Sequence, residues 1–206
     1  MGIPAAGAEV SATNRGAVRS EGDFYRTPRW CVDKLLKEEA VSGYVLDPGC
    51  GDGAISLALQ GQLLSGVANR VLGVEQNESL ASKAVESGVE VFVGDFLDYS
   101  SKVSGYRPYT CVVGNPPYRD AAEWVRAALR CVNPGGKVCF LLRLGFLGSA
   151  RKRMDVVGPG SELSRVYVLG RRPSFTGDSR SDAASYAWFV WIKGCERGQA
   201  ALKVVI

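Results

Sequence analysis

Short runs of apolar, often β-branched residues alternate with amphipathic stretches from residue 44 onward. The short runs predict buried strands, and the amphipathic stretches between them predict helices. Because strands that alternate with crossover helices build parallel sheets, the pattern predicts an α/β fold. The strands are predicted at residues 44–46, 71–75, 89–93, 110–114, 137–142, 165–169 and 186–192.

Capping and breaking residues place the helices between these strands. Asn77 is suited to cap a helix that runs to about Glu86, and Gly88 follows its end. The sequence Asn-Pro-Gly-Gly at 133–136 is expected to end a helix at 121–131. Another helix is predicted at about 54–64, a polar, glycine-bearing stretch at 143–161 and a long loop at 170–183.

The composition fits a single domain. A chain of 206 residues with 46% hydrophobic residues can bury one good core. The first 22 residues are rich in Ala, Gly and Ser and contain no apolar run of signal-peptide length. We therefore expect a flexible tail at 1–22 and one domain at 23–206. No stretch looks like a membrane span, so we expect a cytoplasmic protein.

Cysteine and histidine usage restricts the chemistry. None of the six cysteines forms a C-x-x-C pair, and several lie in apolar runs, which indicates reduced core thiols rather than disulfides. The chain contains no histidine, so we expect no metal site and no histidine base. Any catalysis is expected to use amides, carboxylates, aromatic rings or backbone groups.

Positive charge is concentrated in one part of the chain. The formal net charge is only +4, but residues 143–180 hold eight cations and three carboxylates. A basic surface suits a polyanion, because each phosphate contact releases counterions. An ordinary solvated surface is the alternative, since small charge clusters are common. The cations that we expect to contact nucleic acid are Arg143, Arg151, Lys152, Arg153, Arg171 and Arg172.

A glycine-rich loop, Asp-Pro-Gly-Cys-Gly-Asp-Gly at 47–53, joins the first predicted strand to the following helix. Glycines there let the backbone pass close to a ligand and leave the helix N-terminus open to a negatively charged group. The G-x-G-x-G spacing differs from the G-x-G-x-x-G of dinucleotide folds. Glu75 ends the second strand, where it could accept both ribose hydroxyls of a nucleoside. Asp95 follows the third strand and could accept from an adenine amino group, with Phe96 against the ring.

The fourth predicted strand ends in Asn115-Pro116-Pro117-Tyr118. Two prolines fix the turn and remove two N–H donors, so the carbonyls of Asn115 and Pro116 lack a local partner. The Asn115 side-chain oxygen and the Pro116 carbonyl could each accept one hydrogen of a planar amino group, while Tyr118 stacks on the ring that bears it. A strand that ends in a common turn is the plainer interpretation.

The glycine loop, the two acids and the Asn-Pro-Pro-Tyr turn come in the order found in class I S-adenosylmethionine-dependent methyltransferases, which this chain resembles. The resemblance implies a Rossmann-like fold, with a mostly parallel seven-stranded sheet, helices on both faces and an antiparallel last strand. It implies S-adenosyl-L-methionine as the cofactor. The implied cofactor-binding residues are Asp47, Gly49, Gly51, Glu75, Asp95, Phe96 and Asn115, and the implied catalytic residues are Asn115, Pro116, Pro117 and Tyr118.

Flanking segments resemble the small DNA adenine-N6 methyltransferases of phage and prophage type. Residues 25–28 match the Y-x-T-P segment that this group packs against the methionine end of the cofactor, which adds Tyr25, Thr27 and Pro28 to the implied cofactor site. Residues 143–153, and 172–177 with 186–191, are also similar to that group. No insertion is large enough for a separate target-recognition domain, so sequence specificity stays open.

The implied reaction is a direct in-line methyl transfer to the exocyclic nitrogen of an adenine flipped out of DNA, without a covalent enzyme intermediate. RNA adenine, cytosine N4 of DNA and a protein glutamine amide are alternative acceptors, although the cytosine group more often has Ser in place of Asn115. A non-catalytic binding protein and an oxidoreductase are alternatives of other classes. Oligomeric state and recognition sequence stay open.

Overall fold

The computed structural model describes residues 25–61, 63–64, 67–68, 70–106, 108–148, 150–175, 182–195 and 199–206. The tail expected at residues 1–22 lies outside this part of the chain, and so do residues 176–181 of the loop expected at 170–183.

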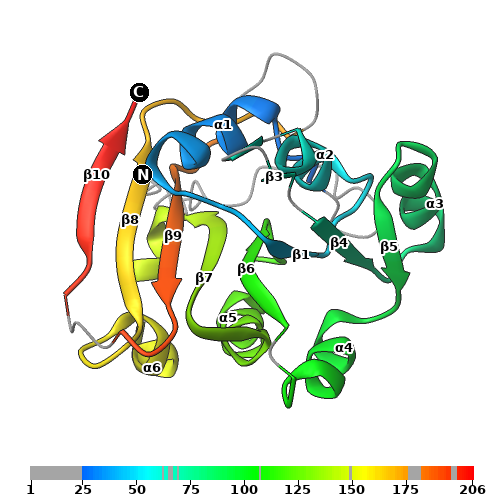
Figure 1. Cartoon of the computed structure of the whole chain (residues 1–206). Helices are drawn as coiled ribbons and strands as arrows, with labels where there is room; N and C mark the ends of the chain where they lie inside the picture. The colour runs from blue at the N-terminus through cyan, green and yellow to red at the C-terminus, as the bar shows by residue number, and fades with distance from the viewer. Residues whose placement is uncertain are drawn as a thin grey trace, which may run out of the picture.

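Eight strands form one sheet in the described ranges, in the order β10-β8-β9-β7-β6-β1-β4-β5 (Figure 1). β9 runs antiparallel to both of its neighbours, and the other pairs in this sheet are parallel. The predicted α/β class is therefore confirmed, and each of the seven predicted strands is present. They are β1 (Tyr44–Pro48), β4 (Arg70–Glu75), β5 (Glu90–Val93), β6 (Tyr109–Gly114), β7 (Val132–Arg143), β8 (Leu163–Leu169) and β9 (Tyr186–Ile192).

The eighth strand, β10 (Ala201–Val205), corrects the expected count of seven. It lies at the edge of the sheet, parallel to β8. Four of its five residues are exposed, so its sequence lacks the buried run that marks most of the other strands. The last of the predicted strands, β9, is antiparallel as expected, but β10 follows it and returns to the common direction.

Helices cover both faces of the sheet (Figure 1). Side chains of α1 and α2 pack into the core on one face, and those of α4, α5 and α6 pack into the core on the other. Every helix in the described ranges is too short or too polar to span a lipid bilayer. The α-helices are α1 (Arg29–Glu38), α2 (Ala54–Gln60), α3 (Glu78–Glu86), α4 (Phe96–Val103), α5 (Ala121–Cys131) and α6 (Met154–Val157), with 3-10 turns η1 (Leu144–Leu147) and η2 (Ala150–Arg153).

Helix α2 is shorter than the sequence predicted. It ends at Gln60 rather than near residue 64, because Gly61 follows and glycine is a poor helix former. Leu63–Leu64 (β2) instead pairs antiparallel with Val67–Ala68 (β3). The apolar residues here suit either a helix or a strand, so their pattern could not decide between them.

The Asn-Pro-Gly-Gly segment at 133–136 lies inside β7 rather than in a separate loop. Helix α5 ends as predicted, but the strand begins at once, with Val132 paired to Tyr109. The register shifts before Lys137 pairs with Cys111. An irregularity in the ladder therefore accommodates the proline and the glycines.

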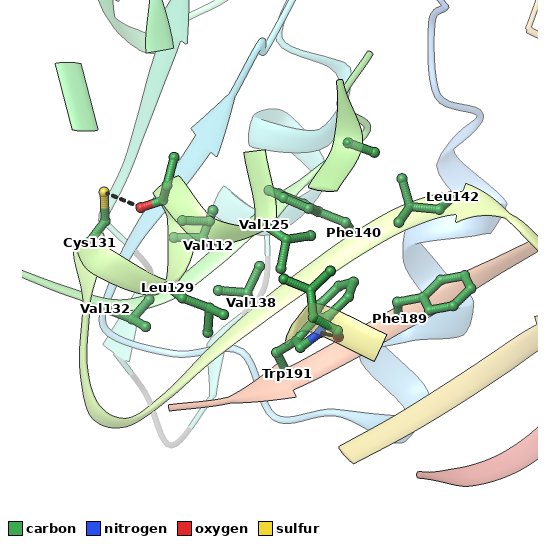
Figure 2. Close-up of a cluster of buried hydrophobic side chains, with 14 of the residues drawn as sticks. Val112, Val125, Leu129, Cys131, Val132, Val138, Phe140, Leu142, Phe189 and Trp191 are labelled. Atoms are coloured by element: carbon green, nitrogen blue, oxygen red, sulfur yellow. Dashed lines mark hydrogen bonds between the residues drawn. The ribbon is translucent and has the colours of Figure 1, made fainter. Parts of the chain in front are cut away.

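The core beneath α5 is densely apolar. Figure 2 shows Val125 and Leu129 of α5 against Val112 of β6 and against Val138 and Phe140 of β7. All five side chains are buried. Burial of such residues stabilises the fold by roughly 1.5–3 kcal/mol each. This packing holds the turn after β6, which carries the Asn-Pro-Pro-Tyr motif, between a rigid strand and a rigid helix.

Two buried tryptophans of β9 tie helices of opposite layers to the sheet. The Trp188 indole donates to the carbonyl of Cys31 in α1 at 2.8 Å. The Trp191 indole donates to the carbonyl of Val156 in α6 at 2.6 Å. Each buried N–H therefore has an acceptor, and β9 anchors both layers.

Candidate active site

A cavity of about 390 Å³ lies at the carboxyl ends of β1, β4, β5 and β6. This edge is where open α/β sheets bind their ligands, because loops leave it in both directions. The segment before α1 closes one side of the cavity. The cavity is lined by Tyr25, Arg26, Thr27, Gly49, Cys50, Asp52, Ala54, Ile55, Val74, Glu75, Gln76, Asn77, Leu80, Gly94, Asp95, Phe96, Asn115, Pro116, Pro117 and Trp124.

Glu75 is the last residue of β4, and two backbone N–H groups hold its carboxylate. Gly51 N donates to Oε2 and Asn77 N donates to Oε1, each at 2.8 Å. The residue is only 8% exposed, yet it lines the cavity. Each carboxylate oxygen keeps a lone pair for another donor, which suits a ligand with two neighbouring hydroxyls.

The glycine loop passes close to α5. Gly49 has a φ of +63°, and a Cβ at this position would lie 3.1 Å from the Trp124 ring. Any other residue would therefore be strained and would press on the cavity wall. Gly51 does not line the cavity, and its contribution is the N–H that fixes Glu75.

Two buried carboxylate oxygens beside this loop, Oδ1 of Asp47 and Oδ1 of Asp52, have no hydrogen-bond partner among the described residues. The other oxygen of Asp47 accepts from the Ser56 backbone N–H at 3.0 Å and from the Ser56 hydroxyl at 2.7 Å. The other oxygen of Asp52 pairs with Arg26. Asp52 lines the cavity, and Asp47 lies fully buried behind the loop. Of the two, only the unpartnered oxygen of Asp52 belongs to a residue that lines the cavity, and a buried acceptor there suits a cationic amino group such as that of an amino-acid moiety.

Asp47 gives the folded protein a specific pH dependence. Burial raises the pKa of Asp47 to about 7, although its hydrogen bonds from Ser56 oppose the rise. The unfolded carboxyl ionises near pH 4, so between about pH 4 and pH 7 the folded chain keeps a proton that the unfolded chain has lost. Stability contributed by this group therefore falls as the pH rises through that window, by about 1.4 kcal/mol per pH unit.

We expect Asp47→Asn to remove this component, because the amide does not titrate and its oxygen can still accept from Ser56. Urea unfolding of both proteins from pH 4.5 to pH 8 measures it. The difference in unfolding free energy between mutant and wild type should grow in favour of the mutant up to about pH 7 and then level off. A difference that does not vary with pH would contradict the assignment.

Asp95 and Phe96 begin α4 at another side of the cavity. Asp95 caps the helix, with Oδ1 accepting from Asp98 N at 3.0 Å, so the second oxygen is available to a ligand. The buried Phe96 ring lies 4.9 Å from the Trp124 ring. An apolar aromatic wall beside a carboxylate suits a heterocycle that carries an amino group.

The amide of Asn115 has a fixed orientation. Its Nδ2 donates to the Tyr25 carbonyl at 3.3 Å and to Thr27 Oγ1 at 3.1 Å. Because a carbonyl can only accept, Nδ2 must face it, and Oδ1 faces the Tyr118 hydroxyl, which donates to it at 2.9 Å. An amide oxygen accepts two hydrogen bonds, so Oδ1 keeps one lone pair for another donor.

Tyr118 belongs to an aromatic cluster next to the cavity rather than to its lining. Its ring stacks on Tyr25 with centroids 5.9 Å apart and lies 5.6 Å from Tyr186. Phe175 packs edge-on against Tyr25 and Tyr186. Burial, together with the neighbouring Tyr186, raises the pKa of Tyr118 well above its usual range. The hydroxyl therefore stays protonated and continues to donate to Asn115.

Arg143, at the end of β7, sits on this cluster. Its guanidinium lies 5.1 Å from the centre of the Tyr118 ring, and its Nε donates to the Tyr186 hydroxyl at 3.3 Å. The Tyr186 hydroxyl in turn donates to Asp182 at 2.9 Å. Arg143 is thus a cation built into the aromatic cluster.

The predicted basic run at 151–153 has divided roles. Arg153 is half-buried, with its Nε donating to the Phe146 carbonyl at 2.8 Å, a second donor on the Gly148 carbonyl, and its guanidinium over the Phe146 ring. Arg153 thus holds the turn at η1. Arg151 and Lys152 are exposed. Of the remaining predicted cations, Arg172 donates to the Ala183 carbonyl at 3.2 Å.

Most of the residues that the sequence predicted for the cofactor and catalytic sites line the cavity, but they make up less than half of its lining. Pro28, Asp47, Gly51 and Tyr118 lie behind the lining. Trp124 was missed, although it touches both the glycine loop and Phe96. It is the one large aromatic residue in an alanine-rich helix directly after the Asn-Pro-Pro-Tyr turn, and that position was the available signal.

Cys50 lines the cavity but is not a nucleophile. Burial, with the nearby Asp47 and Glu75 carboxylates, raises the pKa of its thiol well above the usual range. It therefore stays protonated at neutral pH. In the described part of the chain, no group of three or more Cys, Asp or Glu side chains is placed to hold a metal ion.

Comparison with known proteins connects this architecture to methyltransferases. No protein-family model matches the chain, and no curated protein matches its sequence. The structure is similar to a predicted O-methyltransferase of Agrobacterium tumefaciens, with a TM-score of 0.60, 20% identity and coverage of 85% of this chain and 84% of the other.

Two further solved structures are similar. The methyltransferase subunit of a type I restriction-modification system of Streptococcus thermophilus has a TM-score of 0.64 at 15% identity, over 85% of this chain and 45% of that one. An RNA methyltransferase of Salinibacter ruber, solved with S-adenosyl-L-homocysteine, has a TM-score of 0.51 at 18% identity, over 81% and 92%. The fold is therefore the Rossmann-like fold of class I methyltransferases.

Proposed function

We propose that this protein transfers a methyl group from S-adenosyl-L-methionine to the exocyclic amino group of a nucleobase, with adenine N6 in DNA as the favoured acceptor. The observation that carries the proposal is the Asn115 amide, which belongs to a lining residue of the cavity, has its orientation fixed by Tyr25, Thr27 and Tyr118, and keeps one lone pair on its oxygen. The methyltransferase fold supports the reaction class.

The cavity suits the proposed cofactor along its length. Glu75 would take the ribose hydroxyls, while Asp95, Phe96 and Trp124 would hold the adenine. The unpartnered oxygen of Asp52 suits the amino group at the other end. Bound there, the cofactor supplies an electrophilic methyl group on a sulfonium. The chain's own residues would fix the direction in which that group points.

The acceptor amine would be held by the Asn-Pro-Pro-Tyr turn. Asn115 Oδ1 and the Pro116 carbonyl would each accept one of its hydrogens, which favours a tetrahedral nitrogen and frees its lone pair from the ring. Thr27 and the Tyr25 carbonyl hold the amide so that its oxygen is already in position. As the methyl group passes from sulfur to nitrogen, the nitrogen becomes cationic and would release one of its protons to solvent. Tyr118 is not the base, because its hydroxyl stays protonated and donates to Asn115.

The aromatic cluster supports a nucleobase as the acceptor. Tyr25 and Tyr118 are half-buried, and with Arg143 over the Tyr118 ring they offer stacking and cation–π contacts in one place, while the fully buried Tyr186 supports them from behind. Extruding a base from a duplex costs a few kcal/mol, which such contacts offset. A protein glutamine amide would use the same acceptors, but it has no ring that needs this cluster.

Transfer of labelled methyl from S-adenosyl-L-methionine to unmethylated double-stranded DNA tests the proposal, with mass spectrometry of the released nucleosides. We expect N6-methyladenine. Label on cytosine would move the assignment to N4. Label that appears only on RNA or on a protein amide would overturn DNA as the substrate, and no transfer to any of these would overturn the enzymatic function.

A further inference from the structure

A second groove, of about 420 Å³, runs along α1 from Trp30 to Lys37, where the helix meets the residues after β8 and the end of β10. In Figure 1 the C-terminal end of β10 and α1 lie side by side, and Lys34 of α1 donates to the carbonyl of Ile206. Three cations and one carboxylate line the groove: Lys34, Lys37, Arg171 and Asp33.

The positive charge of the groove is largely uncompensated. Asp33 is already paired with Arg29 at 2.8 Å. The neighbouring Glu38 is paired with Lys203. In the described part of the chain, neither Lys37 nor Arg171 has a carboxylate within ion-pair distance. Lys34 and Lys37 are three residues apart on one helix face, where like charges repel each other unless an anion lies between them.

The floor of the groove is aromatic. The Arg171 guanidinium lies over the Trp30 ring, 4.0 Å from its centre. The planar guanidinium therefore lies exposed above an apolar surface, with its donors available to phosphate oxygens. Two lysines beside it complete a surface that suits an extended polyanion better than a small apolar ligand.

Two short segments connect the groove to the proposed acceptor site. Trp30 follows Thr27, which holds the Asn115 amide, by three residues. Arg171 precedes Phe175, which packs on Tyr25, by four residues. Three residues of chain span at most about 11 Å. A nucleic-acid strand that leaves the acceptor site between these two segments would therefore run over the groove.

We propose that this groove binds the sugar-phosphate backbone of the nucleic-acid substrate, with Lys37 and Arg171 as the phosphate contacts. The inference rests on the proposed function and adds a surface that the clustering of charge in the sequence did not reveal, because Lys34 and Lys37 are remote from the basic stretch at 143–180. Phosphate contacts position the substrate without reading its sequence.

The test is DNA binding by the full chain, measured by fluorescence anisotropy over a range of salt concentrations. The variant combines Lys37→Gln with Arg171→Gln, and the matched control combines Lys102→Gln with Arg130→Gln, two exposed cations on the opposite helical layer. Two lost phosphate contacts should lower the slope of log K against log salt by about 1.8 and weaken binding at low salt roughly tenfold. The control should keep the wild-type slope.

The affinity of each variant for the cofactor, measured without DNA, shows whether the variant is folded. If the double variant is unstable, Lys37→Gln alone serves in its place, because Lys37 is exposed; it should lower the slope by about 0.9. If the wild-type protein methylates DNA and the double variant keeps the wild-type salt slope, the groove does not bind the substrate, and the proposed function still stands. A groove-dependent slope without any methylated nucleoside supports the groove and overturns the proposed function. Wild-type protein that neither binds nor methylates DNA overturns both.

Discussion

Asn115→Ala is expected to lower methyl transfer by at least about 10²–10³-fold while cofactor affinity changes little. The substitution removes an acceptor that acts on the amine as its nitrogen becomes tetrahedral, and preorganised groups of this kind have effects of that size. The measurement is single-turnover transfer of labelled methyl with saturating cofactor, beside equilibrium binding of the cofactor. Turnover close to that of the wild type would exclude Asn115 from catalysis.

Two variants separate chemistry from folding in this test. Thr27→Val removes one acceptor of the Asn115 amide but leaves Oδ1 in place, so we expect a smaller loss, on the order of tenfold. Asn133→Ala changes an asparagine near the start of β7, at the edge of the sheet opposite the cavity, and should retain full activity. A Thr27→Val loss equal to that of Asn115→Ala would mean that the amide acts by holding residues 25–27 in place.

Glu75→Gln is expected to weaken cofactor binding by about 10²-fold and to lower the free energy of unfolding by about 1–3 kcal/mol. The carboxylate accepts from Gly51 N and Asn77 N through different oxygens. A glutamine has one oxygen, so one backbone N–H loses its acceptor and faces an NH₂ group instead. The ligand also loses a charged acceptor for one hydroxyl, a bond worth about 1.5–3 kcal/mol.

Isothermal titration with the cofactor and urea unfolding measure the two effects of Glu75→Gln separately. Glu78→Gln is the matched control, since Glu78 is an exposed carboxylate three residues further along the chain, in the first turn of α3. It should bind the cofactor like the wild type. Unchanged affinity in Glu75→Gln, at any stability, would remove Glu75 from the cofactor site.

The cavity was predictable where its residues follow directly from the ends of strands. Glu75, Asp95 and Asn115 each stand at the end of a strand that the sequence predicted, and parallel strands bring their carboxyl ends to one edge. Trp124 and Asp52 were not predicted, because helix rotation and the path of the glycine loop decide which of their atoms reach the cavity. No local pattern records either.

Surface strands and surface charge were less predictable. β10 is mostly exposed and pairs with β8 across more than thirty residues of chain, so neither burial nor local spacing indicates it. The basic stretch at 143–180 is close in sequence, but Arg153 and Arg143 turn inward to the Phe146 carbonyl and to the aromatic cluster. Charge along the chain therefore did not reveal which cations face outward together.

The sequence by itself determined the α/β class, the strand order along the chain and the acids, amide and glycines that follow each strand, because these depend on local hydrophobic periodicity and backbone conformation. Tertiary structure alone decided that the Asn115 amide is turned by Tyr25 and Thr27, and that Tyr118 lies against Tyr25. Those contacts join segments about ninety residues apart. Only packing of the whole chain brings such segments together, and it fixes which lone pairs are left for a ligand.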